Sequence, residues 1–450
     1  MSDTSVLNAL SPLDGRYAAS TRDLSEYFSE YALIRYRVQA EIEYFIAFCT
    51  TTKLALFSTE QTTKLRSIFT KFSLADAELV KAYEAKCHHD VKAVEYFLRD
   101  ALANLDLANF IPYLHFGLTS EDTNSIAYGL ALKGSRDQVV VPALKKSAAV
   151  LAKFAKKNAA IPILARTHGQ AAIPTTFGKE YAVFLTRLSP ELESLTDLSF
   201  VAKVSGAVGT YAAHDLVFPE INWLGFAQKF LQELGLQADA LSTQVVSPES
   251  YIRYFQTLSR INNILLDCCR DTWQYISDGW MVQAVAQADV GSSTMPQKVN
   301  PIDFENAEGN FGLANALLTH FCQKLPISRL QRDLSDSTVK RSIGVALGYA
   351  ALGYTSFVRG FDKISVNTPK TEQALMAYPE TITEGLQTLL RADGVSDAYE
   401  ILKKAARGKQ NVTLEELRQV ALKHAKTTAT KQKIAKLSPT SYTGLAAQSS

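Results

Sequence analysis

Hydrophobic residues recur every three or four positions along most of the chain, which is the spacing of an amphipathic α-helix. Between residues 23 and 48, for example, Leu24, Tyr27, Tyr31 and Ile34 fall on one such face. Similar patterns predict helices over residues 59–84, 91–105, 120–157, 178–200, 247–288, 304–324 and 337–363. Several of these exceed the roughly 11–12 residues of an average helix, so we expect long helices to dominate the fold.

Alternating apolar and polar positions are scarce, and the chain has neither a G-x-G-x-x-G nor a G-x-x-x-x-G-K-[ST] motif. We therefore predict an all-α protein with a long central helical bundle. Breaks near Pro112 and over residues 364–369 predict three helical domains: 1–111, 112–364 and 365–450. Pro142 and Pro190 lie inside helical runs and should kink or divide them. Long helices with two apolar sides also indicate oligomerisation.

Charge and composition narrow the possible partners. The 450 residues include 47 Lys and Arg against 45 Asp and Glu, a net charge of +2. This balance argues against an RNA-binding helical protein or another nucleic-acid partner, and against an anionic membrane surface. Residues 342–358 are uncharged, but they are fewer than the ~20 that a membrane span requires, so we expect a buried helix.

The N-terminal residues lack the basic start and apolar run of a secretory signal. The five cysteines are scattered and form no C-x-x-C pair, which argues against a disulfide framework and a structural zinc site. These features favour a cytoplasmic protein with reduced thiols.

Two loop segments have the composition of catalytic sites. Residues 291–301, Gly-Ser-Ser-Thr-Met-Pro-Gln-Lys-Val-Asn-Pro, concentrate donors that suit a developing oxyanion, although an ordinary polar turn explains them about equally well. Residues 166–170, Arg-Thr-His-Gly-Gln, place His168 in a glycine-containing loop. Histidine transfers protons near neutral pH, and the alternative is a histidine that bonds a nearby backbone group.

Two further segments look like helix starts with added chemistry. Residues 87–95, Cys-His-His-Asp-Val-Lys-Ala-Val-Glu, suggest a metal, but adjacent histidines point to different sides of a helix. We expect acid–base or substrate contacts there and no metal site; the alternative is a helix N-cap by Asp90. Residues 119–124, Thr-Ser-Glu-Asp-Thr-Asn, are a capping signature whose free N–H groups also suit a phosphate or carboxylate.

Residues 328–341 are rich in both charges. Arg332 and Arg341 stand near Ser337 and Thr338, with acidic residues between them. A solvated mixed-charge helix face is the ordinary interpretation. Arginines beside hydroxyls also suit a bidentate phosphate clamp.

Together, in this order, the segments resemble the fumarase/aspartase superfamily, whose signature loop is similar to residues 291–300, and within it the adenylosuccinate lyase family. The resemblance rests on residues 11–17, 89–98, 119–124, 166–170, 243–244, 301–306 and the basic segment that ends at Arg341. Beyond about Pro369 the match is loose. The resemblance implies three all-α domains and a homotetramer whose active sites are built from three chains. It also implies nucleotide substrates and neither a metal nor an organic cofactor.

The resemblance implies β-elimination of fumarate from adenylosuccinate, giving AMP. It also implies the same reaction on succinyl-aminoimidazole-carboxamide ribonucleotide (SAICAR), giving AICAR, in purine biosynthesis. His168 matches the general acid, Ser292 the general base, and His89 a histidine that orients His168 or the ligand. The matched binding positions are Arg16, Tyr17, His88, Asp90, Thr119, Ser120, Gln244, Ser293, Lys298, Asn300, Asn306, Arg332, Ser337, Thr338 and Arg341. We expect the phosphate among Arg332, Ser337 and Arg341.

Two alternatives remain open. Argininosuccinate lyases have a similar signature loop, but argininosuccinate has no phosphate for a basic segment to clamp. A catalytically silent helical scaffold would be marked by loss of the acid–base pair, whereas His168 and Ser292 are both present. His88 stands where close relatives carry Asn, and Gln297 where many carry His. Because neither is an expected proton carrier, we expect these departures to alter binding or pH dependence and leave the reaction intact.

Overall fold

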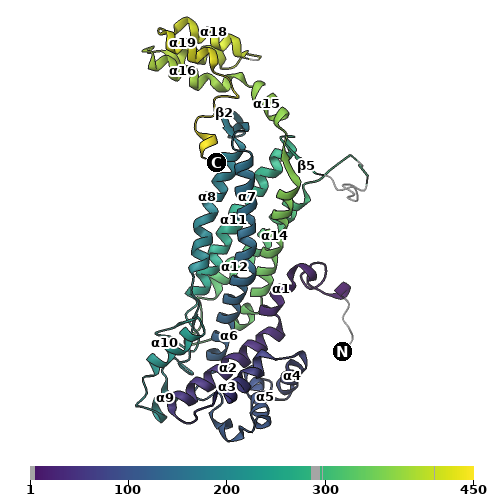
Figure 1. Cartoon of the computed structure of the whole chain (residues 1–450), viewed down its shortest axis with the longest axis vertical. Coiled ribbons are helices and arrows are strands. Elements are labelled where there is room, and N and C mark those ends of the chain that lie inside the picture. Colours follow the sequence, from purple (N-terminus) through teal and green to yellow (C-terminus); the bar gives the residue numbers. More distant parts are fainter. Residues whose placement is uncertain (1–5, 285–293, 296, 410, 450) are drawn as a thin grey trace. The chain divides into compact units, whose positions relative to one another are not determined.

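The computed structural model describes residues 6–284, 294–295, 297–409 and 411–449, and helices dominate them (Figure 1). The strands in the described part of the chain form three two-stranded sheets. The predicted all-α class is therefore confirmed. Of the helices described, none combines the length and the hydropathy that crossing a membrane requires.

The chain forms two compact units. The first unit comprises residues 1–144, 191–263 and 309–354, and the second comprises residues 145–190, 264–308 and 355–450. Five helices contribute residues to both units: α7 (Val141–Lys157), α8 (Phe177–Asp197), α11 (Glu249–Ser277), α12 (Ile302–Lys324) and α14 (Ile343–Lys363). The division into domains 1–111, 112–364 and 365–450 stays a prediction.

Helix α2 is the centre of the first unit, and both of its faces are largely buried. It packs against α6 and against α3, α4 and α5 (Figure 1). Most helices and strands of this unit lie wholly within it. The bounds are α1 (Ala18–Phe28), α2 (Glu30–Thr52), α3 (Thr59–Thr70), α4 (Leu74–Cys87), α5 (Asp90–Asn104), α6 (Ser120–Ser135), β3 (Val201–Ala202), α9 (Ala212–Val217), α10 (Trp223–Glu233), β4 (Gln237–Ala238) and α13 (Ser335–Lys340). Strands β3 and β4 pair in parallel.

Two predicted long helices are each divided by a serine. Ser29 separates α1 from α2, and its Oγ accepts the N–H of Ala32 at 3.1 Å. Ser73 separates α3 from α4 and forms a capping box with Asp76. An N-cap residue adopts an extended backbone, so the preceding helix has to end before it. The predictions of single helices over 23–48 and 59–84 were therefore wrong at these two positions.

The prolines act differently in the two runs that contain them. Pro142 is the second residue of α7, directly after a π-helical turn at Arg136–Val140 that follows α6. The helical backbone continues from α6 through this turn into α7, so the run is not broken at Pro142, and a π-helical turn just before the proline is the irregularity found there. Pro190, in contrast, lies inside α8, which continues to Asp197 without a π-helical turn.

Other boundaries differ by a turn or more. Helix α11 ends at Ser277, well before the predicted end at residue 288. The predicted helix 337–363 is divided into α13 and α14. Helices α5 and α12 closely follow the predicted segments 91–105 and 304–324.

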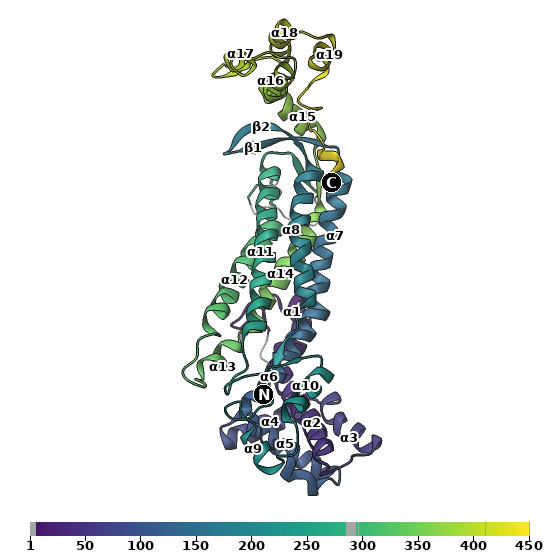
Figure 2. The same cartoon turned by 90° about the vertical axis from the view of Figure 1, so that its left-hand side faces the viewer.

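The second unit contains a β-hairpin that the sequence analysis did not predict. Strands β1 (Pro162–Thr167) and β2 (Gln170–Thr176) pair antiparallel, with an irregularity in register between Leu164 and Arg166. The irregularity interrupts the apolar–polar alternation by which strands are recognised. The hairpin packs against α15 (Thr368–Met376) (Figure 2).

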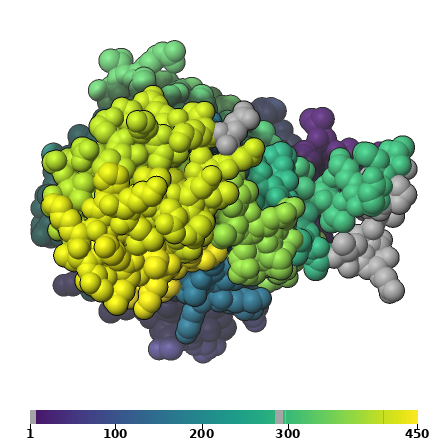
Figure 3. Space-filling view, turned by 90° about the horizontal axis from the view of Figure 1, so that it is seen from above, coloured from purple at the N-terminus to yellow at the C-terminus, as the bar shows by residue number. Residues whose placement is uncertain are grey.

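The rest of the second unit includes a small helical module. Strands β5 (Met281–Gln283) and β6 (Ile364–Val366) pair antiparallel before it begins. The module helices are α16 (Thr383–Ala392), α17 (Ala398–Ala406), α18 (Leu414–His424) and α19 (Thr428–Lys436), which form one continuous surface, yellow to yellow-green in Figure 3. Leu386, Leu390, Leu402, Leu417 and Ile434 form its buried core.

Candidate functional site

The basic segment before and within α13 gathers polar groups from distant parts of the first unit. Arg332 donates from Nη1 to Gln244 Oε1 at 3.1 Å and from Nη2 to Ser337 Oγ at 3.1 Å. The same Nη2 lies 3.2 Å from Glu121 Oε1. The structure thus brings together three residues that the sequence analysis assigned to substrate binding: Gln244, Arg332 and Ser337.

Glu121 also holds the far end of this segment. Its Oε2 accepts from Lys340 Nζ at 3.3 Å, and Lys340 pairs with Asp336 at 2.6 Å. Glu121 and Lys340 are 1% and 7% exposed. Buried charges are costly unless they are paired. These side chains therefore hold one another in place and stiffen the basic segment.

Asp90 forms a second centre at the start of α5. Its Oδ2 accepts from Arg37 Nη2 at 2.7 Å and from Arg341 Nη2 at 3.3 Å. Arg341 also donates from Nη1 to Glu30 Oε2 at 3.0 Å. Arg37 is buried and Arg341 is half exposed. The structure thus brings together Asp90 and Arg341, both predicted binding residues.

Asn124 joins these two centres. Its Oδ1 accepts from Arg37 Nε at 2.8 Å, and its Nδ2 donates to Glu121 Oε1 at 2.8 Å. A continuous chain of polar contacts therefore runs through the residues that we call the arginine network: Arg37, Asp90, Glu121, Asn124, Arg332, Lys340 and Arg341. Two guanidinium groups, those of Arg332 and Arg341, lie at its ends.

The charge states of the acidic and basic side chains in the network follow from the ion pairs that they form. Burial would raise the pKa of Asp90, but Arg37, the Val91 N–H and Arg341 outweigh it and hold that pKa below its usual value. Burial is likewise outweighed at Glu121, whose pKa is lowered by Lys340 and Arg332. Burial opposes the charge on Lys340, yet Glu121 and Asp336 raise its pKa. The carboxylates and the ammonium group therefore stay charged near neutral pH.

The two histidines before α5 are placed by backbone geometry. His88 is the C-cap of α4 in the left-handed region, with φ 53°. His89 is the N-cap of α5, and its Nδ1 accepts the N–H of Lys92 at 3.1 Å. The alternative interpretation, in which Asp90 caps this helix, is therefore wrong, because Asp90 is engaged by arginines instead. About half of the His89 side chain is exposed.

Thr119 and Ser120 begin α6, and the predicted helix start is confirmed there. The N–H of Thr119 donates to Asp122 Oδ2 at 2.8 Å, which is one half of a capping box. Ser120 is the first residue of the helix, and Thr338 lies within α13. Arg16 and Tyr17 lie in the turn before α1, with the Arg16 guanidinium 5.9 Å from the centre of the Tyr17 ring.

A cavity of about 510 Å³ opens beside Arg341. It is lined by residues of α1, the first residues of α14 and Glu30. Gly344 and Gly348 are among its lining residues, and they let Phe28 and Leu13 pack closely against α14, since an added Cβ would lie 2.4 Å from Phe28 Cβ or 3.0 Å from Leu13 Cδ1. This is a space within the first unit that a ligand of Arg341 can occupy.

Elsewhere in the first unit, a buried histidine gives a testable pH dependence. His214 is 1% exposed, and its Nε2 lies 2.7 Å from the Tyr44 hydroxyl. Burial lowers its pKa from 6.5 to about 4. The unfolded chain therefore binds a proton between pH 6.5 and 4 that the folded chain does not.

We expect the free energy of unfolding to fall as the pH falls through this window, by about 2–3 kcal/mol from His214 alone. Urea unfolding at pH 7 and pH 4.5 measures it. The variant His214→Gln keeps a polar partner for Tyr44 but does not titrate, so it should lack this component. An equal loss of stability in the wild type and the variant would contradict the assignment.

His168 lies at the tip of the β1–β2 hairpin in the second unit. Thr167 pairs with Gln170, so His168 and Gly169 are the two central residues of the turn. Both have positive φ, 54° and 75°. A two-residue hairpin turn with positive φ at both positions favours glycine and tolerates histidine or asparagine at one of them. The turn presents the His168 imidazole to solvent.

The remaining predicted residues also belong to the second unit. The Lys298 N–H donates to Met295 O at 3.0 Å, and its side chain is exposed. Asn300 precedes α12 and Asn306 lies in it. Gln283 Nε2 donates to Val299 O at 3.3 Å, which ties this segment to β5. Ser292 and Ser293 lie outside the described residues.

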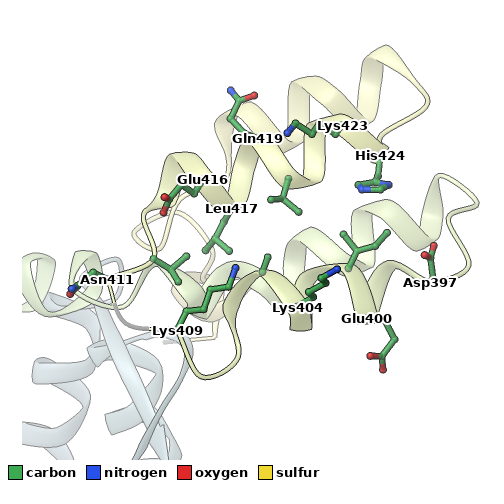
Figure 4. Close-up of a pocket in the computed structure, with 14 residues that line it drawn as sticks. Asp397, Glu400, Lys404, Lys409, Asn411, Glu416, Leu417, Gln419, Lys423 and His424 are labelled. Atoms are coloured by element: carbon green, nitrogen blue, oxygen red, sulfur yellow. The ribbon is translucent and has the colours of Figure 1, made fainter.

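A separate hollow of about 830 Å³ lies between α17 and α18. Figure 4 shows Lys404 on one helix facing Leu417, Lys423 and His424 on the other, with Asp397 and Asn411 toward opposite ends. It contains none of the predicted site residues. Among the described residues, no three His, Cys, Asp or Glu side chains are grouped so as to hold a metal ion.

The sequence analysis did not include Arg37, Glu121, Asn124 or Lys340 among the site residues. Arg37 gave no distinguishing signal, because Arg35, Gln39 and Glu41 are also polar and stand close to it in the same helix. Glu121 and Asn124 stood in the recognised capping segment and Lys340 in the basic segment. Their burial, which distinguishes them from ordinary surface charges, depends on contacts far away in sequence.

Two family models match the chain. Residues 15–314 match a model described as lyase, and residues 328–443 match one described as adenylosuccinate lyase C-terminal. An adenylosuccinate lyase from Legionella pneumophila (strain Corby) is 42% identical over 446 residues, covering 98% of each chain. An adenylosuccinate lyase from Dictyostelium discoideum is 44% identical, covering 90% of each chain. One from Escherichia coli (strain K12) is 40% identical, covering 99% of this chain and 98% of the relative.

The chain belongs to the adenylosuccinate lyase family. The resemblance inferred from the motifs is thereby confirmed, and with it the assignment to the C–N lyases. Solved structures agree in fold. A fumarate lyase from Mesorhizobium sp. BNC1 superposes with a TM-score of 0.76 at 18% identity, covering 95% of this chain and 96% of the other. A 3-carboxy-cis,cis-muconate lactonizing enzyme from Pseudomonas putida gives 0.76 at 19% identity, with 95% coverage of both chains.

Proposed function

We propose that the chain cleaves adenylosuccinate into AMP and fumarate, and SAICAR into AICAR and fumarate, in purine and AMP biosynthesis. The observation that carries the proposal is identity of 40% or more to adenylosuccinate lyases along nearly the whole chain. The arginine network supports it, because both substrates carry a phosphate, which guanidinium groups bind and an acidic site would repel.

In this proposal the substrate phosphate binds Arg332, Ser337 and Arg341. Arginine binds phosphate oxygens through paired N–H donors. The contact between Arg332 and Ser337 supports a shared role in binding. The cavity beside Arg341 offers space next to the second guanidinium. Gln244, Asp90, His88, Thr119 and Ser120 would then contact other parts of the nucleotide.

The elimination needs a base and an acid. Ser292 removes a proton from the succinyl carbon next to a carboxylate, and the electron pair left behind forms the carbon–carbon double bond of fumarate. The C–N bond breaks, and His168 donates a proton to the departing nitrogen. Lys298 and Asn300 bind the carboxylate on which negative charge develops. His89 orients His168 or the ligand.

These steps use protein side chains alone, so the proposal needs neither a metal nor an organic cofactor. A serine hydroxyl is a weak base, so Ser292 has to react as an alkoxide. The ammonium group of Lys298 in the same loop offers the positive charge that such an alkoxide needs.

We propose further that the protein acts in the cytoplasm as a homotetramer with active sites shared between chains. Exposed apolar side chains on the long helices, including Trp273 at 42% and Leu313 at 52%, support association with other copies. Tyr17, Arg16, Ser293 and Asn306 would complete such a shared site.

The test follows fumarate by proton NMR after mixing the purified protein with adenylosuccinate, with argininosuccinate in a parallel sample. We expect fumarate from adenylosuccinate only, because argininosuccinate has no phosphate for the arginines. Fumarate from argininosuccinate only would agree with the proposed elimination reaction but would refute adenylosuccinate as the substrate. No fumarate from either, with a folded protein, would favour the silent scaffold.

A further inference from the structure

Glu121 is an almost completely buried acid at the start of α6, and it has more partners than a helix cap needs. Its Oε1 lies 3.2 Å from Arg332 Nη2 and accepts from Asn124 Nδ2 at 2.8 Å. Its Oε2 accepts from Lys340 Nζ at 3.3 Å. The carboxylate that caps α6 is that of Asp122, so capping does not explain Glu121.

The partners of Glu121 stand at both ends of one segment. Arg332 precedes α13 and Lys340 is its last residue. Ser337 lies between them, and Arg341 follows directly. One carboxylate on α6 therefore fixes the segment that carries all three proposed phosphate ligands.

A second connection runs from Glu121 to Arg341. Asn124 joins Glu121 to Arg37, Arg37 donates to Asp90, and Asp90 accepts from Arg341. Arg37 and Asn124 are 3% and 6% exposed, so water competes little for these contacts. The connection is thus buried from Glu121 to Arg37, and its last member before Arg341, Asp90, is partly exposed.

We propose that Glu121 is a positioning residue for the substrate phosphate, which holds Arg332 directly and Arg341 through the contacts that begin at Asn124. This inference rests on the proposed function. Glu121 itself does not contact the phosphate, because its oxygens are buried and already occupied, and because like charges repel. It acts through Arg332, Lys340 and Asn124.

Glu121 has two opposite effects on binding of the substrate phosphate, and a measurement can distinguish them. Its contacts with Arg332 and Lys340 organise the phosphate site, which favours binding. Its negative charge repels the phosphate, which opposes binding. Replacing Glu121 by Gln removes the charge and retains the shape, so the sign of the change in KM shows which effect dominates.

The experiment measures kcat and KM of the full-length enzyme with adenylosuccinate and with succinyladenosine, which lacks the phosphate. We expect Glu121→Gln and Glu121→Asp to raise the KM for adenylosuccinate about tenfold or more, with kcat changed little. The KM for succinyladenosine should stay near the wild-type value. The control is Glu60→Gln, which breaks an exposed pair with Lys64 on α3 and should change neither KM.

An unchanged or lower KM for adenylosuccinate in Glu121→Gln would overturn the proposal. So would an equal rise for both substrates, which would indicate a general distortion of the site. If melting curves show that Glu121→Gln does not fold, Asn124→Ala removes the link to Arg37 while retaining the Glu121 charge. It should produce the same selective rise, and its failure to do so overturns the inference. A wild-type enzyme that forms no fumarate from adenylosuccinate would instead refute the proposed function.

Discussion

Replacing His168 by Asn should lower kcat for fumarate release by about 10²–10⁴-fold, which is the usual contribution of a general acid. Asparagine suits the positive φ of 54° at the tip of the hairpin, so the turn should keep its conformation. Because the His168 side chain is exposed, the melting temperature should hardly change. Initial rates at saturating adenylosuccinate and a thermal melt measure the two quantities.

The matched control is His424→Asn, which replaces an exposed histidine in the last turn of α18 by the same residue. It should leave kcat at the wild-type value. A near-normal kcat in His168→Asn would remove His168 from the mechanism. A large drop in melting temperature would show that the hairpin, and not proton transfer, had been damaged.

Lys203→Met should destabilise the protein by about 3–5 kcal/mol, because it leaves a buried charge without its partner. Lys203 Nζ and Asp122 Oδ1 are 2.5 Å apart, and both side chains are fully buried. Burial already raises the pKa of Asp122, and Lys203 opposes that rise. Without Lys203, Asp122 has to bind a proton or remain charged in the interior with backbone N–H groups, those of Thr119 and Gly206, as its hydrogen-bond donors. The midpoint of urea unfolding at pH 7 reports the loss.

The double variant Asp122→Asn with Lys203→Met tests the cause. It removes both charges, and the side-chain amide introduced at position 122 still accepts a backbone N–H, so we expect part of the lost stability to return. If the double variant were less stable than Lys203→Met, the loss would come from packing and other contacts of Asp122, and the unpaired charge would not be its cause.

The fold class followed from periodicity because most of this protein's core is built by helices with regular apolar spacing. Helix limits were harder to predict, because the same spacing continues across Ser29 and Ser73. Each serine caps the start of a new helix through side-chain hydrogen bonds, which apolar periodicity does not register. The β1–β2 hairpin was missed for a related reason, since its irregular register removes the alternation of a strand.

The candidate site was predicted in part. Motifs supplied Asp90, Gln244, Arg332, Ser337 and Arg341, which the structure connects through short polar contacts. The connecting residues were not predicted, because their role depends on distant partners.

Arg37, for example, bonds Asn124, which is 87 positions away. Taken alone, a buried arginine and a surface arginine look the same in the sequence. Only the assembled unit shows that Arg37 is 3% exposed and therefore structural.

The contact between Glu30 and Arg341 spans 311 positions of the sequence. During synthesis on the ribosome, Glu30 and the acidic members of the arginine network emerge long before Arg332, Lys340 and Arg341. Glu30, Asp90 and Glu121 have to remain hydrated and unpaired with Arg332, Lys340 and Arg341 until translation has passed residue 341. Contacts of such sequence separation form late and slow folding. A nascent chain of this protein therefore acquires its phosphate-binding groups as one of the last events of folding, after the helices around α2 have already packed.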